Sequence, residues 1–229
     1  MSIKIQKTSD IKDQGVKCVI YGGAGVGKTR ACATAPRPII ISAESGLLSL
    51  RDVECDFIEI KKLKDLDAAY NELKKSDDYD TICLDSLSEI CEVVLAELIP
   101  DAKDKRQAYG GMAEAIMPML KRFRDLPGKN VIFTVKMVSI QDEESGKVTQ
   151  ELFIPGKVLP NQIPYLVDEL FFMEVDRKGA QIMHTKPGRS YFAKDRSGAL
   201  ENSEKPVKGA TEVNMTTIIN KIKEKTGEK

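Results

Sequence analysis

A glycine-rich stretch near the N-terminus has the residue types and the spacing that suit phosphate binding. It fits the pattern G-x-x-x-x-G-K-[ST] and reads Gly22, Gly23, Ala24, Gly25, Val26, Gly27, Lys28, Thr29. Glycines let the backbone wrap around phosphate oxygens without Cβ clashes, so that successive N–H groups can point at the anion. Lys28 adds a positive charge, Thr29 offers a hydroxyl to Mg²⁺, and Arg30 follows directly. The stretch therefore predicts a site for a nucleoside triphosphate and Mg²⁺, against the alternative of a turn that binds nothing.

Two acidic residues that follow apolar runs could supply the other groups of such a site. Asp85 ends the run Thr81 to Leu84, and a carboxylate there would anchor the water shell of a Mg²⁺ ion held by Thr29. Hydrolysis also needs a group that orients the attacking water. The residue after Asp85 is a serine, so we expect this second carboxylate to be Glu44, which follows the run Ile39 to Ser42. An ordinary capping aspartate and an ordinary loop glutamate remain the alternatives.

The apolar pattern indicates the elements that must position these residues. Buried strands are expected at 18–21, 39–42, 55–60, 79–85 and 131–135, and helices at 30–35, 63–73, 87–98 and 112–126. Polar residues and two glycines between 100 and 111 favour a flexible loop. Further along, a hairpin is expected at 138–154, strands at 170–175 and 181–184, and an amphipathic helix at 213–225.

Alternating strands and helices predict an α/β fold with a mostly parallel central sheet flanked by helices, and with antiparallel strands in the C-terminal third. We expect one core at 17–200, an N-terminal arm at 1–16, and a linker with a short helix at 201–229. In parallel sheets ligands bind at the carboxyl ends of the strands. The glycine-rich stretch, Glu44 and Asp85 all follow strands, so this fold would bring them to the same edge.

Composition narrows the class of partner and the compartment. The 229 residues carry 35 basic and 35 acidic side chains, so a nucleic-acid site would have to be a local patch. The five cysteines include no C-x-x-C pair, as in proteins of a reducing cytoplasm. No apolar run approaches the roughly 18 residues of a membrane span, and the N-terminus does not resemble a signal peptide. A cytoplasmic protein without a membrane partner is expected.

The order GGAGVGKT, then IIISAE, then TICLDS resembles the RecA-like P-loop ATPases. The resemblance implies ATP as the nucleotide, Glu44 as the carboxylate that primes water, and Asp85 as the Mg²⁺ anchor. RecA itself has a glutamine at the end of the strand that here ends at Val135-Lys136. Lys136 could contact a γ-phosphate, but a lysine cannot accept a hydrogen bond. Any relay from nucleotide to DNA would therefore work differently in this chain.

A second match, Lys194-Asp195-Arg196-Ser197-Gly198, resembles the K-x-R-x-G element of the RadA, DnaB and KaiC branches. In those families the lysine and the arginine reach the γ-phosphate of a neighbouring subunit. The resemblance thus implies a homo-oligomer, ring or filament, whose active site is shared, with Lys194 and Arg196 acting across the boundary. A solvated basic turn is the alternative.

As a whole, residues 16–200 resemble the phage-encoded Sak-type proteins, which are minimal RecA-like cores associated with annealing and recombination of single-stranded DNA. This implies a partner in single-stranded DNA and the cytoplasm of a host bacterium; a single-strand DNA-binding protein is a further candidate partner. By position the DNA would meet two segments, 103–112 with Lys105, Arg106 and Tyr109, and 138–156 with Lys147. Ordinary solvated loops remain the alternative for both.

A different class of function stays open beside this one. The zero net charge and the acids at 142–144 favour a nucleotide-switched module that loads or remodels a replication or packaging partner without binding DNA itself. A small-molecule kinase ranks last, because the C-terminal third has few arginines for a lid. The only histidine, His184, alternates with Ile182 on a predicted strand, which favours a structural role.

Overall fold

Apolar runs rich in isoleucine and valine form a ten-stranded sheet in the computed structural model, which describes residues 14–44, 47–206 and 212–227. The strands are β1 (Lys17–Gly22), β2 (Pro38–Ser42), β3 (Asp56–Glu59), β4 (Thr81–Leu84), β5 (Asn130–Gln141), β6 (Val148–Phe153), β7 (Glu169–Val175), β8 (Gln181–His184), β9 (Lys194–Asp195) and β10 (Ser203–Glu204). Their order is β10-β8-β7-β1-β5-β4-β2-β3, with β6 beside β5 and β9 beside β7. The predicted arm at 1–16 lies almost entirely outside the described residues.

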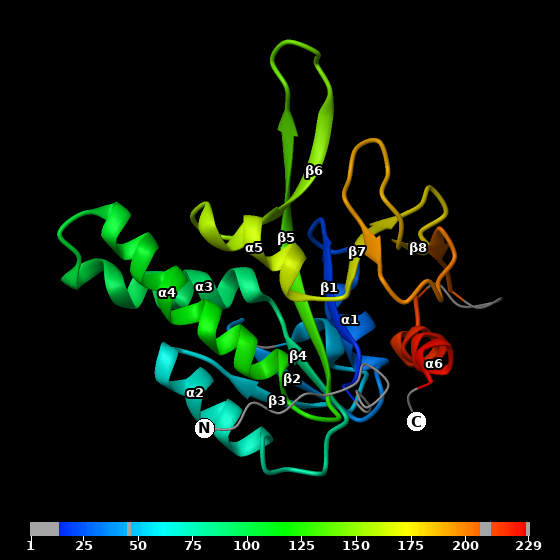
Figure 1. Cartoon of the computed structure of the whole chain (residues 1–229), viewed down its shortest axis with the longest axis horizontal. Coiled ribbons are helices and arrows are strands. Elements are labelled where there is room, and N and C mark those ends of the chain that lie inside the picture. The colour runs from blue at the N-terminus through cyan, green and yellow to red at the C-terminus, as the bar shows by residue number, and fades with distance from the viewer. Residues whose placement is uncertain (1–13, 45–46, 207–211, 228–229) are drawn as a thin grey trace, which may run out of the picture.

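The centre of the sheet is parallel and its C-terminal part is antiparallel. β1 pairs in parallel with β5 and β7, and β2 pairs in parallel with β3 and β4. β6, β8, β9 and β10 run antiparallel to their partners, and β5 with β6 forms a long hairpin that projects from the body (Figure 1). The predicted fold class and the predicted hairpin are confirmed.

Helices cover both faces of the sheet (Figure 1). They are α1 (Lys28–Ala33), α2 (Leu63–Leu73), α3 (Leu87–Leu98), α4 (Lys105–Arg124), α5 (Val158–Leu166) and α6 (Met215–Thr226), with short 3₁₀ turns at Leu48–Leu50 and Ile99–Asp101. Alternate residues of β1 serve two separate cores, because side chains of a strand point to opposite faces. Val19 and Tyr21 pack with α2, α3, α4 and α5, whereas Cys18 and Ile20 pack with α1 and α6.

Helix α4 begins at Lys105, so the prediction of a flexible loop that continues to residue 111 is wrong. Asp104 Oδ1 accepts a hydrogen bond from Gln107 N at 2.9 Å, and Gln107 Oε1 accepts one from Lys103 N at 2.7 Å. This reciprocal cap starts the helix. Glycines 110 and 111 cost the helix about 1 kcal/mol each relative to alanine. Burial of the neighbouring Ala108 and Met112 offsets that cost.

The sequence pattern does not predict helix α5 (Val158–Leu166), because its two prolines hide the helical spacing. Leu159, Ile163 and Leu166 recur at helical spacing and are buried. Pro160 lies in the first turn, where a missing N–H costs little. Pro164 lies further in, and its carbonyl oxygen accepts a hydrogen bond from Lys194 at 2.6 Å. A contact distant in sequence thus helps to hold this turn.

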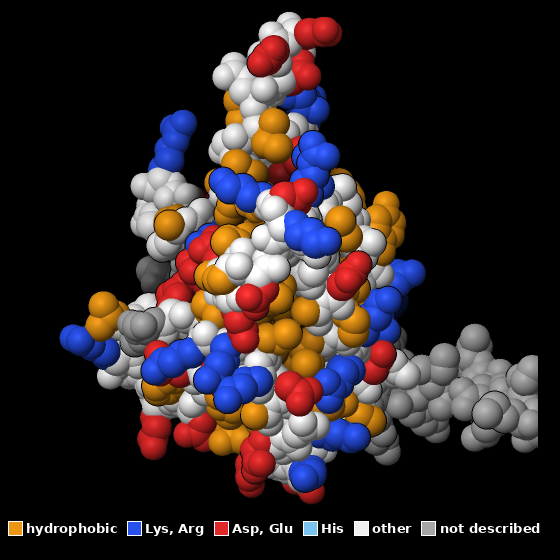
Figure 2. All heavy atoms as spheres, turned by 90° about the vertical axis from the view of Figure 1, so that its left-hand side faces the viewer, with side chains coloured by type: hydrophobic (Ala, Val, Ile, Leu, Met, Phe, Trp, Pro, Cys, Tyr) orange, Lys and Arg blue, Asp and Glu red, His pale blue; other side chains and the backbone are white. Residues whose placement is uncertain are grey.

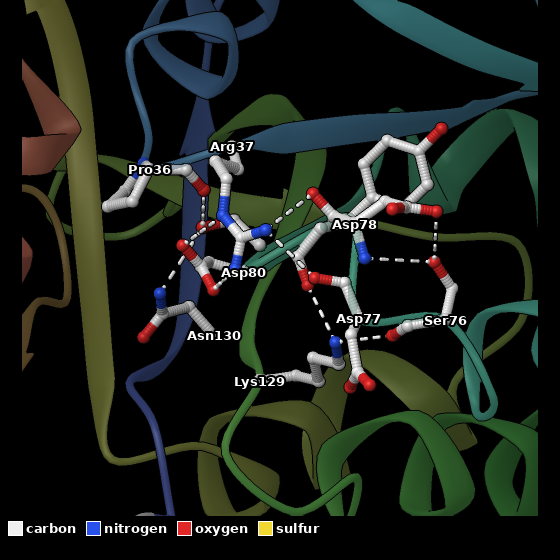
Figure 3. Close-up of polar contacts among 10 residues, drawn as sticks. Pro36, Arg37, Ser76, Asp77, Asp78, Asp80, Lys129 and Asn130 are labelled. Carbon is white, nitrogen blue, oxygen red and sulfur yellow. Dashed lines mark hydrogen bonds and ion pairs between the residues drawn. The ribbon is translucent and has the colours of Figure 1, made fainter.

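A polar network joins the amino ends of β2, β4 and β5, at the edge of the sheet opposite the glycine-rich loop (Figure 3). The guanidinium of Arg37 donates to both carboxylate oxygens of Asp80 at 2.8 and 2.6 Å and to the carbonyl oxygens of Asp77 and Asp78. Lys129 donates to two further carbonyl oxygens of the 76–79 turn. These contacts join parts of the chain to one another, so we assign the network a structural role.

Among the described residues, no helix is both long and apolar enough to cross a membrane.

Candidate active site

The glycine-rich loop connects β1 to α1, as predicted, and three of its glycines have conformations or contacts that exclude a side chain. Gly25 and Gly27 have positive φ angles of 74° and 93°. A Cβ on Gly22 would lie 2.2 Å from the carbonyl oxygen of Met173 in β7, and one on Gly27 would lie 2.0 Å from the side-chain nitrogen of Gln181 in β8. The close approach of β7 and β8 therefore fixes the path of the loop.

Lys28 is the first residue of α1, and its ammonium group lies across the loop. Nζ donates to the carbonyl oxygens of Gly22 at 2.9 Å and Gly23 at 2.8 Å. Burial lowers the pKa of Lys28, and the charges of Asp85 and Glu44 partly counteract this shift. A cation held in this way is placed for a polyphosphate that follows the loop.

Asp85 follows β4 and is almost completely buried. One carboxylate oxygen accepts a hydrogen bond from the hydroxyl of Thr134 on β5, and the backbone N–H of Asp85 donates to Ile41 O at 2.8 Å. The next peptide bond, to Ser86, is cis. The Ser86 side chain then caps α3 by accepting a hydrogen bond from Glu89 N at 3.3 Å. Asp85 is thus held between two strands and a helix start, and among the described residues its second carboxylate oxygen accepts no hydrogen bond.

Glu44 follows β2 at the same edge of the sheet and is exposed. Its backbone N–H donates to the Ser42 hydroxyl at 3.1 Å. Partial burial raises the pKa of Glu44, and the negative charges of Asp85 and Glu89 raise it further. A glutamate with a raised pKa is better matched to proton transfer near neutral pH than an isolated one.

Lys136 on β5 pairs with two glutamates of α3. Its ammonium group contacts Glu89 and lies 3.1 Å from Glu92 Oε1, and its backbone N–H donates to the Ser88 hydroxyl at 2.9 Å. Burial alone would lower the pKa of Lys136, but the hydrogen bonds to Glu89 and Glu92 outweigh it and raise the pKa. Sequence reasoning had missed Glu89. The spacing Ser86-x-x-Glu89 after the strand was the signal, since an acid in the first turn of a helix faces the strand ends.

One cavity of about 590 Å³ brings most of the predicted residues together. It is lined by Gly22, Ala24, Gly25, Gly27, Lys28, Thr29, Arg30, Glu44, Asp85 and Lys136, and also by Ser49, Ser86, Glu89 and Met137. Gly23 and Val26 line a neighbouring cavity on the β7 side of the loop. Arg30 is held by ion pairs to Asp52 and Glu212. A loop that needs glycine at three positions, a half-buried lysine, a hydroxyl and a buried carboxylate together fit a nucleoside triphosphate with Mg²⁺.

Lys194 and Arg196 are not among the described residues that line this cavity. Lys194 donates to the carbonyl oxygens of Pro164 and Val167, both at 2.6 Å, and burial followed by the charge of Arg196 lowers the pKa of Lys194. Arg196 is largely exposed and lies 2.9 Å from Asp168. Their predicted role concerns a neighbouring subunit, and within one chain they form part of the β9 corner.

The residues predicted to meet DNA lie on two separate elements. Lys105, Arg106 and Tyr109 occupy the first turns of α4, where the Tyr109 ring packs beside Gly156. Lys147 follows the turn of the β5–β6 hairpin and lines a different cavity of about 380 Å³. His184, interpreted as structural, bonds to Glu174 and Tyr191 through its two ring nitrogens.

Comparisons with known proteins agree with this geometry. The model of the AAA domain family matches residues 14–197. Among solved structures, a KaiC-like protein of the hyperthermophilic archaeon Pyrococcus horikoshii OT3 superposes with a TM-score of 0.51 at 10% sequence identity, over 84% of this chain and 85% of that one. At that identity the likeness concerns the fold. Curated proteins yield no match. Since the family match spans most of the chain, the protein belongs to the AAA domain family and is a P-loop ATPase with a RecA-like fold.

Proposed function

We propose that the protein is a Mg²⁺-dependent ATPase that acts on single-stranded DNA in annealing or strand exchange, as Sak-type phage proteins do. The observation that carries the ATPase part is the single cavity that holds Lys28, Glu44 and Asp85 around the glycine-rich loop. Bound Mg²⁺ and ATP would supply the scissile phosphoryl group and the charge that offsets it. The chain's own residues would bind the phosphates, orient the attacking water and accept its proton.

The position of each residue supports the role that we assign to it. The glycine-rich loop and Lys28 would bind the phosphates, and Thr29 with Asp85 would hold the metal. Glu44, with its raised pKa, accepts the proton of the attacking water. Lys136 is already neutralised by Glu89 and Glu92, so its contact with phosphate would require it to leave them.

The second half of the proposed site comes from a neighbouring subunit through Lys194 and Arg196. A guanidinium on the developing charge of a transferred phosphoryl group accelerates transfer by roughly 10³- to 10⁵-fold. The Arg196–Asp168 ion pair is exposed on both sides and contributes at most about 1 kcal/mol, so releasing it on assembly costs little.

The first experiment tests ATP hydrolysis and DNA binding separately. Wild-type protein should hydrolyse ATP only with Mg²⁺, Lys28→Ala should abolish hydrolysis, and Glu44→Gln should keep ATP binding while losing most of the rate. Hydrolysis by Glu44→Gln at the wild-type rate would show that Glu44 does not accept the proton of the attacking water. Binding of labelled oligo(dT) at low and moderate salt then tests the DNA part, because contacts to phosphates must weaken as salt rises.

A nucleotide-switched loading or remodelling module is the second candidate. Asp142, Glu143 and Glu144 cluster at the tip of the projecting hairpin, where acidic side chains are prominent (Figure 2), and they disfavour DNA at that point. Absence of salt-sensitive binding to oligo(dT), in the presence of ATP hydrolysis, would favour this candidate over the recombination protein.

A further inference from the structure

A second cleft, of about 380 Å³, lies at the base of the hairpin and is separate from the cavity of the glycine-rich loop. Figure 1 shows α5 on one side of the hairpin and the segment that follows β8 on the other. Three walls line the cleft. They include Lys147 and Gln150 from β6 and its turn, Pro164 from α5, and Arg189, Tyr191 and Phe192 from the segment after β8.

The aromatic wall of this cleft is rigid. The Tyr191 ring stacks on Phe172 with centroids 4.7 Å apart and an interplanar angle of 21°. The Tyr191 hydroxyl bonds to His184 Nδ1 at 3.0 Å, and His184 Nε2 bonds to Glu174 at 2.8 Å. The Phe192 side chain beside it is 47% exposed. The fixed ring of Tyr191 next to the exposed ring of Phe192 offers a stacking surface that loses little conformational entropy when a base binds.

The cleft also carries positive charge, of which that of Arg189 is not paired with any described residue. Arg189 is exposed and makes no hydrogen bond or ion pair with any residue that the structure describes. Lys147 lines the same cleft, and Glu151 is the one acid among its lining residues. The acidic cluster lies at the hairpin tip, where Asp142 accepts hydrogen bonds from Ser145 and its N–H donates to Lys147 O at 2.9 Å. The charge of Lys147 lowers the pKa of Asp142, so Lys147 faces the acids on one side and the cleft on the other, whereas Arg189 faces no such acid among the cleft's lining residues except Glu151. Figure 2 shows acidic side chains at the tip and basic ones closer to the body.

The side chain of Tyr21 connects this cleft to the nucleotide site. Tyr21, fully buried, is the residue directly before Gly22 of the glycine-rich loop. Its hydroxyl donates to Phe192 O at 2.7 Å and accepts from Phe192 N at 3.1 Å. The hairpin is connected to the segment that carries Phe192, because Gln150 N donates to Ser190 O at 2.6 Å. A shift of the loop would therefore move the wall that presents Phe192.

We propose that this cleft is the principal contact for single-stranded DNA, with a base on Phe192 against Tyr191 and phosphates at Arg189 and Lys147. Cations interleaved with exposed aromatic rings bind single strands without reading sequence. The proposal rests on the proposed function and adds the place of binding and its route to the ATP site through Tyr21. It moves the main contact away from Lys105 and Arg106 on α4.

The test measures binding of fluorescein-labelled oligo(dT) to the full chain with a non-hydrolysable ATP analogue at several salt concentrations. Arg189→Ala and Phe192→Ala should each weaken binding roughly tenfold. Arg189→Ala should also lower the salt slope by about 0.7, as the loss of one phosphate contact does for a single strand. Matched controls are Arg177→Ala, at an exposed position in the β7–β8 turn, and Phe57→Ala, which is 55% exposed on edge strand β3. Both should bind as wild type.

The outcomes separate this proposal from the one on which it rests. Wild-type binding that Lys105→Ala/Arg106→Ala abolishes and that Arg189→Ala and Phe192→Ala leave intact would overturn the cleft and keep the DNA function. Absence of wild-type binding at low salt would overturn both. Equal losses of binding in the test variants and in their controls would also overturn the proposed binding site, because the loss would then not depend on where the substituted residue lies.

Tyr21→Phe tests the connection, because it removes the hydroxyl and keeps the buried ring. Stimulation of ATP hydrolysis by oligo(dT) should require at least severalfold more DNA in this variant. Melting of Tyr21→Phe must first be shown cooperative by circular dichroism, and Phe123→Leu, at a buried position of α4 that does not line the cleft, serves as a second core variant that should keep wild-type stimulation. Wild-type stimulation in Tyr21→Phe would overturn the coupling route.

Discussion

Glu44 shows how neighbouring charges adjust one residue of the active site. Burial and the charges of Asp85 and Glu89 all raise its pKa, so a fraction of the protein holds Glu44 protonated at mildly acidic pH. A protonated glutamate cannot accept the proton of water. The acidic limb of the rate profile should therefore lie above the ordinary pKa of a glutamate.

The corresponding prediction concerns Glu89→Gln. The change removes one negative charge near Glu44 and frees Lys136 from one of its two partners, and both effects lower the pKa of Glu44. We expect the acidic limb of the kcat profile to move to lower pH, measured as ATP turnover under saturating Mg²⁺ between pH 5 and 9. Glu92→Gln is the matched control for the release of Lys136, because Glu92 is the other partner of Lys136 but is not among the groups that shift Glu44, so the limb should move further in Glu89→Gln than in Glu92→Gln. A limb that stays in place, or moves upward, would contradict the assigned charge coupling.

Glu169 carries a second prediction at this scale, for stability. This buried residue of β7 lies opposite Asp195 of β9, and its Oε2 has no hydrogen-bond partner among the described residues. Burial and the charge of Asp195 raise its pKa from 4.5 to about 7. Between those two values the folded chain keeps a proton that the unfolded chain loses, so this residue's contribution to stability falls as pH rises from about 4.5 to 7.

Glu169→Gln removes that titration and keeps an oxygen for the N–H of Ser197. Relative to wild type, the variant should gain roughly 2–3 kcal/mol in the free energy of unfolding between pH 5 and pH 8. Urea titrations at the two pH values measure it. Asp168→Asn, an exposed neighbour, should show no comparable change. A constant difference between Glu169→Gln and wild type across this range would refute the buried titration.

At the scale of elements, the C-terminal helix supports the helix of the glycine-rich loop. The N-terminal backbone of α6 docks on the end of α1, where Met215 N donates to the Thr34 hydroxyl at 2.7 Å and Thr216 N donates to Thr34 O at 3.2 Å. Just before α6, Val213 N donates to Gln181 Oε1 at 2.8 Å, and the same side chain touches Gly27. Helix α6 lies beyond the boundary that the sequence predicts at residue 200, and it shares a hydrophobic core with α1.

Thr34→Val tests this docking, because it keeps the shape and removes the acceptor of Met215 N. An N–H left without a partner in a buried site costs about 1–3 kcal/mol. We expect that loss in the free energy of unfolding by urea, with an unchanged m-value. Thr217→Val, the same change at an exposed position of α6, should stay within about 0.5 kcal/mol of wild type. Equal effects of the two variants would mean that the Thr34 contact contributes nothing.

The elements that could be predicted from sequence are those whose signal is local. The glycine pattern, the apolar runs at 39–42 and 131–135 and the hairpin turn depend on neighbours in the chain, and the structure confirms them. The start of α4 could not be placed, because burial of Ala108 and Met112 outweighs two glycines. Helix α5 is supported by the hydrogen bond from Lys194 to Pro164 O, and the pairing of Lys136 with Glu89 joins residues 47 positions apart. Such contacts exist only after folding.

For the whole molecule, the decisive question is whether one chain contains a complete active site. The cavity holds the phosphate loop, Glu44 and Asp85, whereas Arg196 lies on the β9 corner against Asp168. Head-to-tail packing of identical subunits would bring the corner of one chain to the cavity of the next. Glu44→Gln and Arg196→Ala should then each be inactive alone, for different reasons.

Mixing the two inactive variants tests the shared site. A cavity from an Arg196→Ala chain next to a Glu44→Gln chain has an intact Glu44 and receives an intact Arg196, so random head-to-tail assembly of equal amounts restores about a quarter of the sites. ATP turnover of the mixture should rise accordingly, and excess Glu44→Gln should raise the activity per Arg196→Ala chain toward saturation. Size-exclusion chromatography must show that the variants co-assemble. No recovery in co-assembled mixtures would mean that Arg196 does not act on a neighbour's nucleotide. Recovery that instead scales with the amount of a single variant would indicate residual activity of that chain, and it too would count against sharing.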